Sequence, residues 1–165
     1  MRLYINEKLL SLHNKYYIND ENDNNILEIT SKFISIGDKT WIKDLSGNEL
    51  AYIEQEIFHL MPKYNIYINN ELAYSISKKF QLFKNDYVLS NNYKVEGDFL
   101  SHSFCVYNDK EEKIGEISRK YFSISDKYII DIIDEKEYLL VLSIIVAITN
   151  DIDRAQNAAA NSSNN

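Results

Sequence analysis

A short motif recurs through the chain, and its period constrains the fold more than any other feature of the sequence. The clearest copies are KLLSLHNK, KFISIGDK, EIFHLMPK and KYFSISDK, which begin at Lys8, Lys32, Glu56 and Lys120; looser copies begin at Lys79 and Asp98. The first three copies are 24 residues apart. A unit of that length is too short for a strand–helix–strand crossover, which needs about 30 residues. It fits two strands of about five or six residues and two short turns, so the six copies predict about twelve strands.

The segments between the motifs alternate in polarity, as half-buried antiparallel strands do. Within residues 63–69, Tyr64, Ile66 and Ile68 share one face, and Tyr67 lies on the other face between two asparagines. Leu72, Tyr74 and Ile76 alternate in the same way with Ala73 and two serines. A period of two, with many aromatic and β-branched residues, predicts strands, and no helical period fits these segments.

Asparagine and aspartate take the place of glycine and proline between the predicted strands. The chain has only 4 Gly and 1 Pro, whereas Asn and Asp cluster at residues 20–25, 44–48, 69–70, 91–92 and 108–112. Both residues tolerate left-handed backbone angles and hydrogen-bond to nearby backbone groups, so we predict turns at these clusters, including a two-residue hairpin at Asn69-Asn70. An open sheet of about twelve strands would curl or split, and closure removes its edges. We therefore predict a mainly β protein, a closed antiparallel barrel.

The C-terminal part of the sequence differs from the repeats and predicts a helix over residues 137–154. Residues 138–148 are apolar except for Ser143. A membrane-spanning helix needs about 20 apolar residues, and a shorter helix that is apolar on all sides is usually buried in a core. We expect this helix to fill the lumen of the barrel. Residues 1–154 are then expected to form a single domain, and the Ala-, Asn- and Ser-rich residues 155–165 a disordered tail.

Charge and cysteine content limit the partners and the cellular setting. The net charge is −7, which disfavours nucleic-acid binding. The single cysteine, Cys105, cannot form an internal disulfide, and its apolar neighbours predict a buried thiol. No signal peptide is apparent, so we expect a cytoplasmic protein, with peripheral membrane association and the oligomeric state left open.

Several segments resemble the LURP-one-related family, whose members have the tubby C-terminal-like fold. They are KFISIGDK (32–39), DLSGNELAYI (44–53), LMPKYNIYI (60–68), VEGDF (95–99) and KYFSISDKY (120–128). The resemblance covers about residues 1–154, is close to small bacterial members, and implies a twelve-stranded barrel around a central helix. Tubby proteins and phospholipid scramblases, which are relatives of the family, suggest association with phosphoinositides or membranes. The chain lacks the cysteine cluster that scramblases use for acylation, and it has no local motif that matches the tubby phosphoinositide site.

The sequence contains no recognisable catalytic, metal-binding or cofactor-binding motif. None of the histidines His13, His59 and His102 has a second ligand at metal-binding spacing. No phosphate-binding loop, nucleophile elbow or zinc pattern is present. We therefore expect a non-enzymatic protein that needs neither a cofactor nor a metal.

Basic residues recur at equivalent positions of the repeat and supply the candidate binding site. Lysines flank the motif copies at Lys8, Lys15, Lys32, Lys39, Lys63, Lys79, Lys120 and Lys127. A second basic residue directly precedes two of them: Lys78 precedes Lys79, and Arg119 precedes Lys120. Lys78, Lys79, Arg119 and Lys120 are therefore the candidate residues for an anionic ligand, either a phospholipid headgroup or an acidic partner protein. The alternative interpretation is that these lysines only deter edge pairing and aggregation.

Aromatic residues supply a second candidate face, formed by Trp41, Tyr52, Tyr67 and Tyr87. Cross-strand packing alone also explains them, because the chain has 13 Tyr. Three classes of function remain open: a non-enzymatic module that binds phospholipid headgroups or a protein partner, a small-ligand carrier or enzyme, and a scramblase-like membrane protein. A helix in the lumen disfavours the second class because it occupies the space that a ligand would need, and its length disfavours the third.

Overall fold

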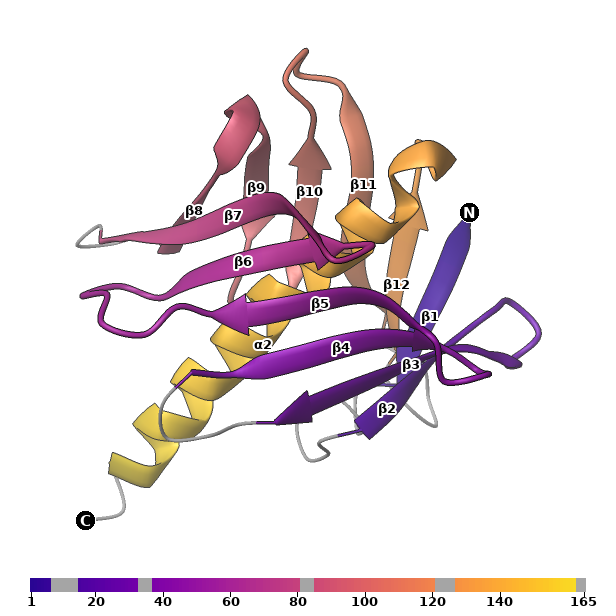
Figure 1. Ribbon diagram of the computed structural model, residues 1–165, viewed down its shortest axis with the longest axis horizontal. Coiled ribbons are helices and arrows are strands. Elements are labelled where there is room, and N and C mark those ends of the chain that lie inside the picture. The colour runs from indigo at the N-terminus through magenta and orange to yellow at the C-terminus, as the bar shows by residue number, and fades with distance from the viewer. Residues whose placement is uncertain (7–14, 33–36, 81–84, 121–126, 163–165) are drawn as a thin grey trace.

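Antiparallel strands close into a barrel around one helix in the computed structural model, which describes residues 1–6, 15–32, 37–80, 85–120 and 127–162 (Figure 1). The described strands are β1 (Arg2–Asn6), β2 (Lys15–Asn19), β3 (Asn25–Lys32), β4 (Lys39–Asp44), β5 (Glu49–Gln55), β6 (Lys63–Ile68), β7 (Glu71–Phe80), β8 (Asn85–Leu89), β9 (Lys94–Asp98), β10 (Ser103–Tyr107), β11 (Lys113–Lys120) and β12 (Lys127–Ile132). Short 3₁₀ turns η1 (Ser90–Asn92) and η2 (Glu135–Glu137) precede β9 and the helix α2 (Tyr138–Ser162). The predicted fold class is confirmed.

Each strand pairs with its neighbours in sequence, and β1 closes the barrel by pairing with β12. The closing ladder runs from Arg2, opposite Asp131, to Asn6, opposite Lys127. The β1–β2 and β8–β9 ladders are much shorter, with one residue pair each. These two short ladders are therefore the weakest parts of the barrel wall among the described residues.

Asn and Asp form the turns, as the sequence predicts. Asn69 and Asn70, between β6 and β7, have φ angles of 53° and 64°, which is the left-handed conformation of a two-residue hairpin. At another turn, the Asp44 Oδ1 accepts hydrogen bonds from the backbone N–H groups of Ser46, at 2.9 Å, and Asn48, at 2.8 Å. The side chains of Asp20 and Asn108 make the same pair of bonds in their own turns. A carboxylate or amide oxygen thus orders each of these turns, and the turns at Asp20 and Asn108 contain no glycine.

The helix α2 fills the barrel lumen, and this prediction is also confirmed. Every residue from Leu140 to Thr149 is buried. The inward-facing residues of the strands, such as Ile18, Ile42 and Ile66, pack around it in one continuous core. The wall approaches the helix closely at Gly115, where a Cβ atom would lie only 2.3 Å from the Val141 Cγ1. Gly115 is therefore required for space.

The helix is longer than the sequence analysis expects. It continues to Ser162, so residues 155–162 are helical and exposed where a disordered tail was predicted; residues 163–165 lie outside the described residues. Alanine supplies four of the residues between 155 and 160, and it has the highest helix propensity of all residues. An alanine-rich segment that follows a packed helix can extend it by propensity alone.

Two of the motif copies lie largely in connections between strands, whereas their apolar cores were expected in strands. The EIFHLMPK copy links β5 to β6, and residues 99–102 of the copy at Asp98 link β9 to β10. The cores of the other copies fall largely on residues 7–14, 33–36, 81–84 and 121–126, outside the described residues.

Two side-chain predictions were wrong. Leu72 is exposed instead of sharing the buried face of Ile76, because the β6–β7 register shifts between Leu72 and Tyr74 and leaves Ala73 as an extra residue. Cys105 lies between the buried residues Phe104 and Val106 and is only half-buried. It therefore belongs to the outer face of β10.

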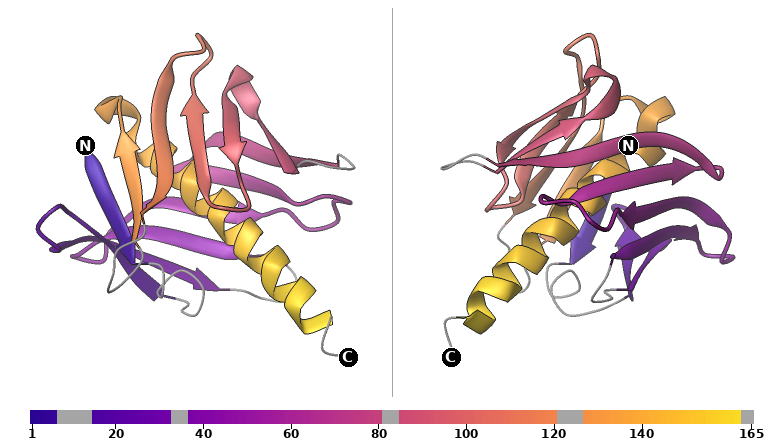
Figure 2. Two further views of the ribbon diagram at one scale, coloured as in Figure 1. Left: turned by 180° about the vertical axis from the view of Figure 1, so that it is seen from behind. Right: turned by 60° about the vertical axis from the view of Figure 1, so that its left-hand side comes forward.

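The odd-numbered strands end, and the even-numbered strands begin, at one end of the barrel, because neighbouring strands run in opposite directions. The C-terminal part of α2 leaves the barrel at this end (Figure 2). There, Arg154 of α2 donates a 2.6 Å hydrogen bond to Asp38, before β4, and Asp153 of α2 lies 3.0 Å from His102, before β10. We call this the exit end of the barrel.

Candidate functional site

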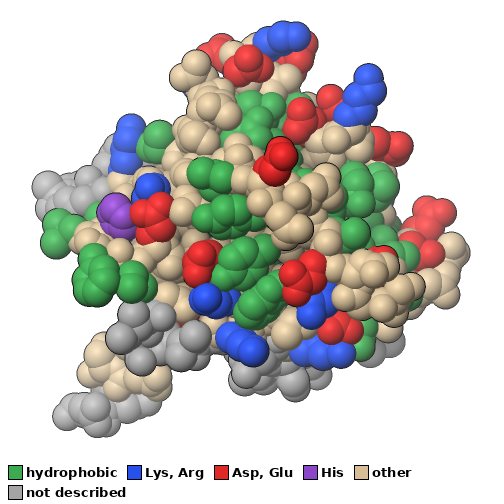
Figure 3. All heavy atoms as spheres, in the orientation of Figure 1, with side chains coloured by type: hydrophobic (Ala, Val, Ile, Leu, Met, Phe, Trp, Pro, Cys, Tyr) green, Lys and Arg blue, Asp and Glu red, His purple; other side chains and the backbone are tan. Residues whose placement is uncertain are grey.

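The β5–β6 connection at the exit end exposes large apolar side chains. The side chains of Phe58 and Leu60 are 96% and 101% exposed, and Ile57 is also exposed. Figure 3 shows a group of hydrophobic side chains that projects at the left edge, where Figure 1 places this connection. Phe58 has a φ of 70°, which is rare for a bulky residue and costs about 1–3 kcal/mol. The connection therefore holds apolar groups in water with its backbone under strain.

A single carboxylate, that of Glu56, orders this connection from the barrel side. Its oxygens accept hydrogen bonds from the Lys63 Nζ at 2.8 Å and the Asn65 Nδ2 at 2.7 Å, and the His59 Nε2 lies 2.6 Å away. These partners, with Lys63 first, lower the pKa of Glu56 to about 2. Lys63 and Asn65 of β6 and His59 of the connection thus contact Glu56, while Phe58 and Leu60 are exposed to solvent.

Lysines surround the exit end on the outer face of the wall. They stand where strands meet the odd-to-even connections and comprise Lys15, Lys32, Lys39, Lys63, Lys79, Lys120 and Lys127, which we call the exit-end lysines. Four of them pair with carboxylates: Lys15 with Glu28, Lys39 with Glu54, Lys63 with Glu56, and Lys127 with Asp23. Lys32, Lys79 and Lys120 are exposed. The repeat thus places lysines at one end of the barrel, and carboxylates neutralise several of them.

The four candidate residues from the sequence do not form one cluster. β7, with Lys78 and Lys79, is separated from β11, with Arg119 and Lys120, by three strands. Within each pair, one residue points outward and the other inward. Lys79 and Lys120 are exposed, whereas Arg119 shares the inner face of the buried Ile117, and its Nε atom is buried.

Lys78 points into the barrel, toward a buried carboxylate of the helix. Its Nζ lies 2.8 Å from the Asp151 Oδ2, and the two side chains are 11% and 4% exposed. The same carboxylate accepts hydrogen bonds from the hydroxyl groups of Tyr64, at 2.8 Å, and Tyr87, at 2.7 Å. Burial, followed by the charge of Asp151, raises the pKa of both tyrosines. Because Lys78 forms an ion pair with Asp151 inside the barrel, we leave Lys78 out of the proposed binding surface.

Sequence reasoning missed the role of Asp151, although a signal was present. Asp151 follows the apolar run 138–148 at a position that the helix still buries. A charged residue that continues the buried part of a helix requires a partner of opposite charge. That partner lies 73 residues away in the sequence, so only the fold identifies it.

The predicted aromatic face is formed in part. Trp41, Tyr52 and Tyr67 lie directly opposite one another on β4, β5 and β6, with ring centroids 5.4 Å and 5.8 Å apart. Tyr87 belongs to the interior, beside Asp151. Within the described part of the chain, no group of three or more His, Cys, Asp and Glu residues is arranged to hold a metal ion.

Comparison with known proteins identifies the family. The family model described as LURP-one-related matches residues 1–149. The chain belongs to the LURP-one-related family. Over 149 residues it is 28% identical to the uncharacterized protein YxjI of Bacillus subtilis (strain 168), covering 90% of this chain and 91% of that protein. The predicted family is thus confirmed.

A solved structure supports the fold of this LURP-one-related chain. An Arabidopsis thaliana protein of known crystal structure aligns with a TM-score of 0.57 and 17% identity, covering 89% of both chains. At this identity the likeness concerns the fold alone, which is the tubby-like barrel. None of the described helices combines the length and the apolar character that a membrane span requires.

Proposed function

We propose that this LURP-one-related protein is a non-enzymatic binding module that attaches to the surface of membranes containing anionic phospholipid. The exit end of the barrel would face the membrane. Ile57, Phe58 and Leu60 would enter the interface between headgroups and acyl chains, and exposed exit-end lysines would contact phosphate groups.

The exposure of Phe58 and Leu60 is the observation that carries the proposal. Transfer of one such side chain from water to an apolar environment is favourable by about 1.5–3 kcal/mol. The fold keeps both side chains in water, in a connection whose Glu56 carboxylate is bonded to Lys63 and Asn65 of β6. A projecting tip fits a soft interface, whereas a flat or concave apolar patch would fit a rigid protein surface.

The lysines at the exit end contribute to membrane binding locally, in spite of the negative net charge. The net charge of −7 opposes adsorption of the whole molecule to an anionic surface. The lysines lie at the same end as the apolar tip, and each lysine close to an anionic membrane contributes about 1 kcal/mol. The Lys78 N–H donates a 3.0 Å hydrogen bond to the Pro62 carbonyl, so the backbone next to Lys79 touches the β5–β6 connection. Lys79 therefore follows directly after a residue that contacts the connection carrying Phe58 and Leu60.

The filled lumen supports a binding role over a catalytic one. Ligand carriers of barrel form hold their ligand inside the barrel. Here α2 occupies that space with side chains that are buried from Leu140 to Thr149. Binding is therefore expected at the outer surface and the ends.

Flotation with lipid vesicles tests the proposal. We expect the protein to float with vesicles of phosphatidylcholine and phosphatidylserine and to float less with phosphatidylcholine alone. Phe58→Asn combined with Leu60→Ser should abolish flotation, and the asparagine keeps the left-handed backbone at position 58 accessible. Leu72→Ser, which removes an exposed leucine at the opposite end, should float as the parent does.

Charge variants separate the electrostatic contribution of the lysines from the apolar contribution of Phe58 and Leu60. Lys79→Glu with Lys120→Glu should weaken binding to phosphatidylserine vesicles, whereas Lys110→Glu, in a turn at the opposite end, should not. Absence of flotation with both kinds of vesicle would contradict the proposal and would favour a protein partner.

A further inference from the structure

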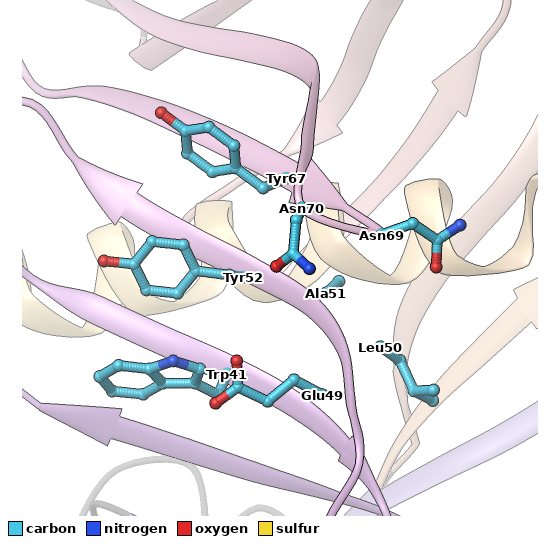
Figure 4. Close-up of a pocket in the computed structure, with 8 residues that line it drawn as sticks. All are labelled: Trp41, Glu49, Leu50, Ala51, Tyr52, Tyr67, Asn69 and Asn70. Carbon is cyan, nitrogen blue, oxygen red and sulfur yellow. The ribbon is translucent and has the colours of Figure 1, made fainter.

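A hollow of about 360 Å³ opens on the outer face of the barrel, away from the exit end. It is lined by Trp41, Glu49, Leu50, Ala51, Tyr52, Tyr67, Asn69 and Asn70. Figure 4 shows the three aromatic side chains in one row from adjacent strands. The volume lies within the range of small-ligand sites in proteins.

Two irregularities in strand pairing shape this hollow. The register shift in the β4–β5 ladder leaves Leu50 as an extra residue, and the shift in the β6–β7 ladder leaves Ala73 as another. Such bulges re-aim side chains and are common beside binding sites. The hairpin residues Asn69 and Asn70 are fixed at one rim by their left-handed backbone angles. The two bulges thus lie beside the hollow, and the hairpin Asn69-Asn70 fixes one side of its rim.

The aromatic row forms a shallow, continuous platform. Trp41 and Tyr52 are inclined to each other by 35°, and Tyr52 and Tyr67 by 32°. Rings in an ammonium-binding cage enclose the cation from several sides, which this row does not do. The centroids are close enough for the rings to touch, so no slot for a proline ring separates them.

A lysine–aromatic contact and an ion pair lie beside the row. The Lys32 Nζ lies 5.5 Å from the centre of the Trp41 ring, and the Lys43 Nζ lies 3.9 Å from the Glu49 Oε1. Glu49 is the charged member of the lining and is paired with Lys43, so the lining suits a neutral ligand. The rim offers carboxylate and amide oxygens as acceptors and amide N–H groups as donors. The Asn70 amide forms no hydrogen bond with another described residue.

We propose that this hollow binds neutral saccharides whose pyranose units carry equatorial hydroxyl groups, as in β-linked glucose or N-acetylglucosamine chains. The ring faces of such sugars present axial C–H groups, which pack on the electron-rich faces of aromatic rings. Their equatorial hydroxyl groups point sideways, toward Glu49 and Asn70. This site is separate from the proposed membrane surface and does not depend on it.

The tryptophan fluorescence of the protein tests this inference directly, because Trp41 is the only tryptophan of the chain. Titration with cellohexaose and with chitohexaose should give a saturable change of emission for at least one of them at millimolar concentration or below. Tyr67→Ala and Asn70→Gly should each weaken that binding about tenfold, as expected for loss of one stacking ring or one bonded amide. Asn70→Gly keeps the left-handed turn, so it separates lost contacts from lost folding. Tyr17→Ala, on β2 outside the row, should bind as the parent does.

Three results would overturn the inference. They are the absence of a saturable change with both sugars, equal affinity of the parent and the Asn70→Gly and Tyr67→Ala variants, and a saturable response to choline in place of the sugars.

Discussion

Lys78 of β7 and Asp151 of α2 form an ion pair of 2.8 Å inside the barrel, and this pair fixes the helix to the wall. Two tyrosine hydroxyl groups complete the hydrogen bonds of the carboxylate. The pair lies below the exit end, where the helix passes from the apolar lumen to solvent. It therefore anchors the helix at the point where apolar packing ends.

Removal of the buried cation should be costly, and removal of its exposed neighbour should not. Lys78→Met leaves the Asp151 carboxylate buried without its counter-charge, so we expect a loss of about 3–5 kcal/mol in the free energy of unfolding. Lys79→Met, one residue along the same strand, should change it by less than about 0.5 kcal/mol. Urea denaturation of both variants measures the difference. Equal effects would show that Lys78 does not form the pair.

The contact between Gly115 and Val141 can be tested with a double-mutant cycle. Gly115→Ala places a methyl group where the Val141 Cγ1 lies, and overpacking of this kind costs about 1–3 kcal/mol. In a Val141→Ala background the same substitution should cost clearly less, because the space is then vacant. Strictly additive free energies of unfolding would mean that the two positions do not touch.

The pKa of Glu56 reports on the order of the β5–β6 connection. Its partners lower the pKa from 4.5 to about 2, so the stabilisation by Glu56 is present in full above about pH 4.5 and is lost as the pH falls toward 2. Carboxyl ¹³C NMR titration should find this low pKa, and Lys63→Met should raise it. A Glu56 pKa near 4.5 in the parent protein would contradict the hydrogen-bonded arrangement.

A charged substitution in the buried part of the helix α2 should prevent folding. Leu142 is fully buried in the lumen, and Leu142→Asp should prevent soluble folding, since an unpaired buried charge costs several kcal/mol. Leu72→Asp, at an exposed leucine, is the matched control and should remain folded by circular dichroism. A folded Leu142→Asp variant would be incompatible with a helix inside the barrel.

The architecture could be predicted well from the sequence, because the architecture depends on periodic features of the sequence. The 24-residue repeat and the Asn and Asp turns, such as Asn69-Asn70, indicate paired strands whatever their exact bounds. The apolar run in α2 indicates its place, since it is too short to span a membrane and too apolar to be exposed.

The site was less predictable because it depends on register and on contacts between distant segments. Lys78 and Lys79 are equivalent in composition, and only the alternation of β7 places one inside and the other outside. The bulge at Ala73 reverses the expected side of Leu72. Phe58 belongs to a motif whose sequence resembles a strand. It is exposed because the motif lies in the connection between β5 and β6.

The central claim is that the tip of the β5–β6 connection enters the membrane interface, and a tryptophan placed at the tip measures this directly. In a Trp41→Phe background, Phe58→Trp provides a single reporter, and Leu72→Trp in the same background provides the control at the opposite end. With vesicles of phosphatidylcholine and phosphatidylserine, the emission of the tip reporter should shift to shorter wavelength and be quenched by lipids with brominated acyl chains, while the control should not change. An unshifted and unquenched tip reporter, in the presence of these vesicles, would contradict the account.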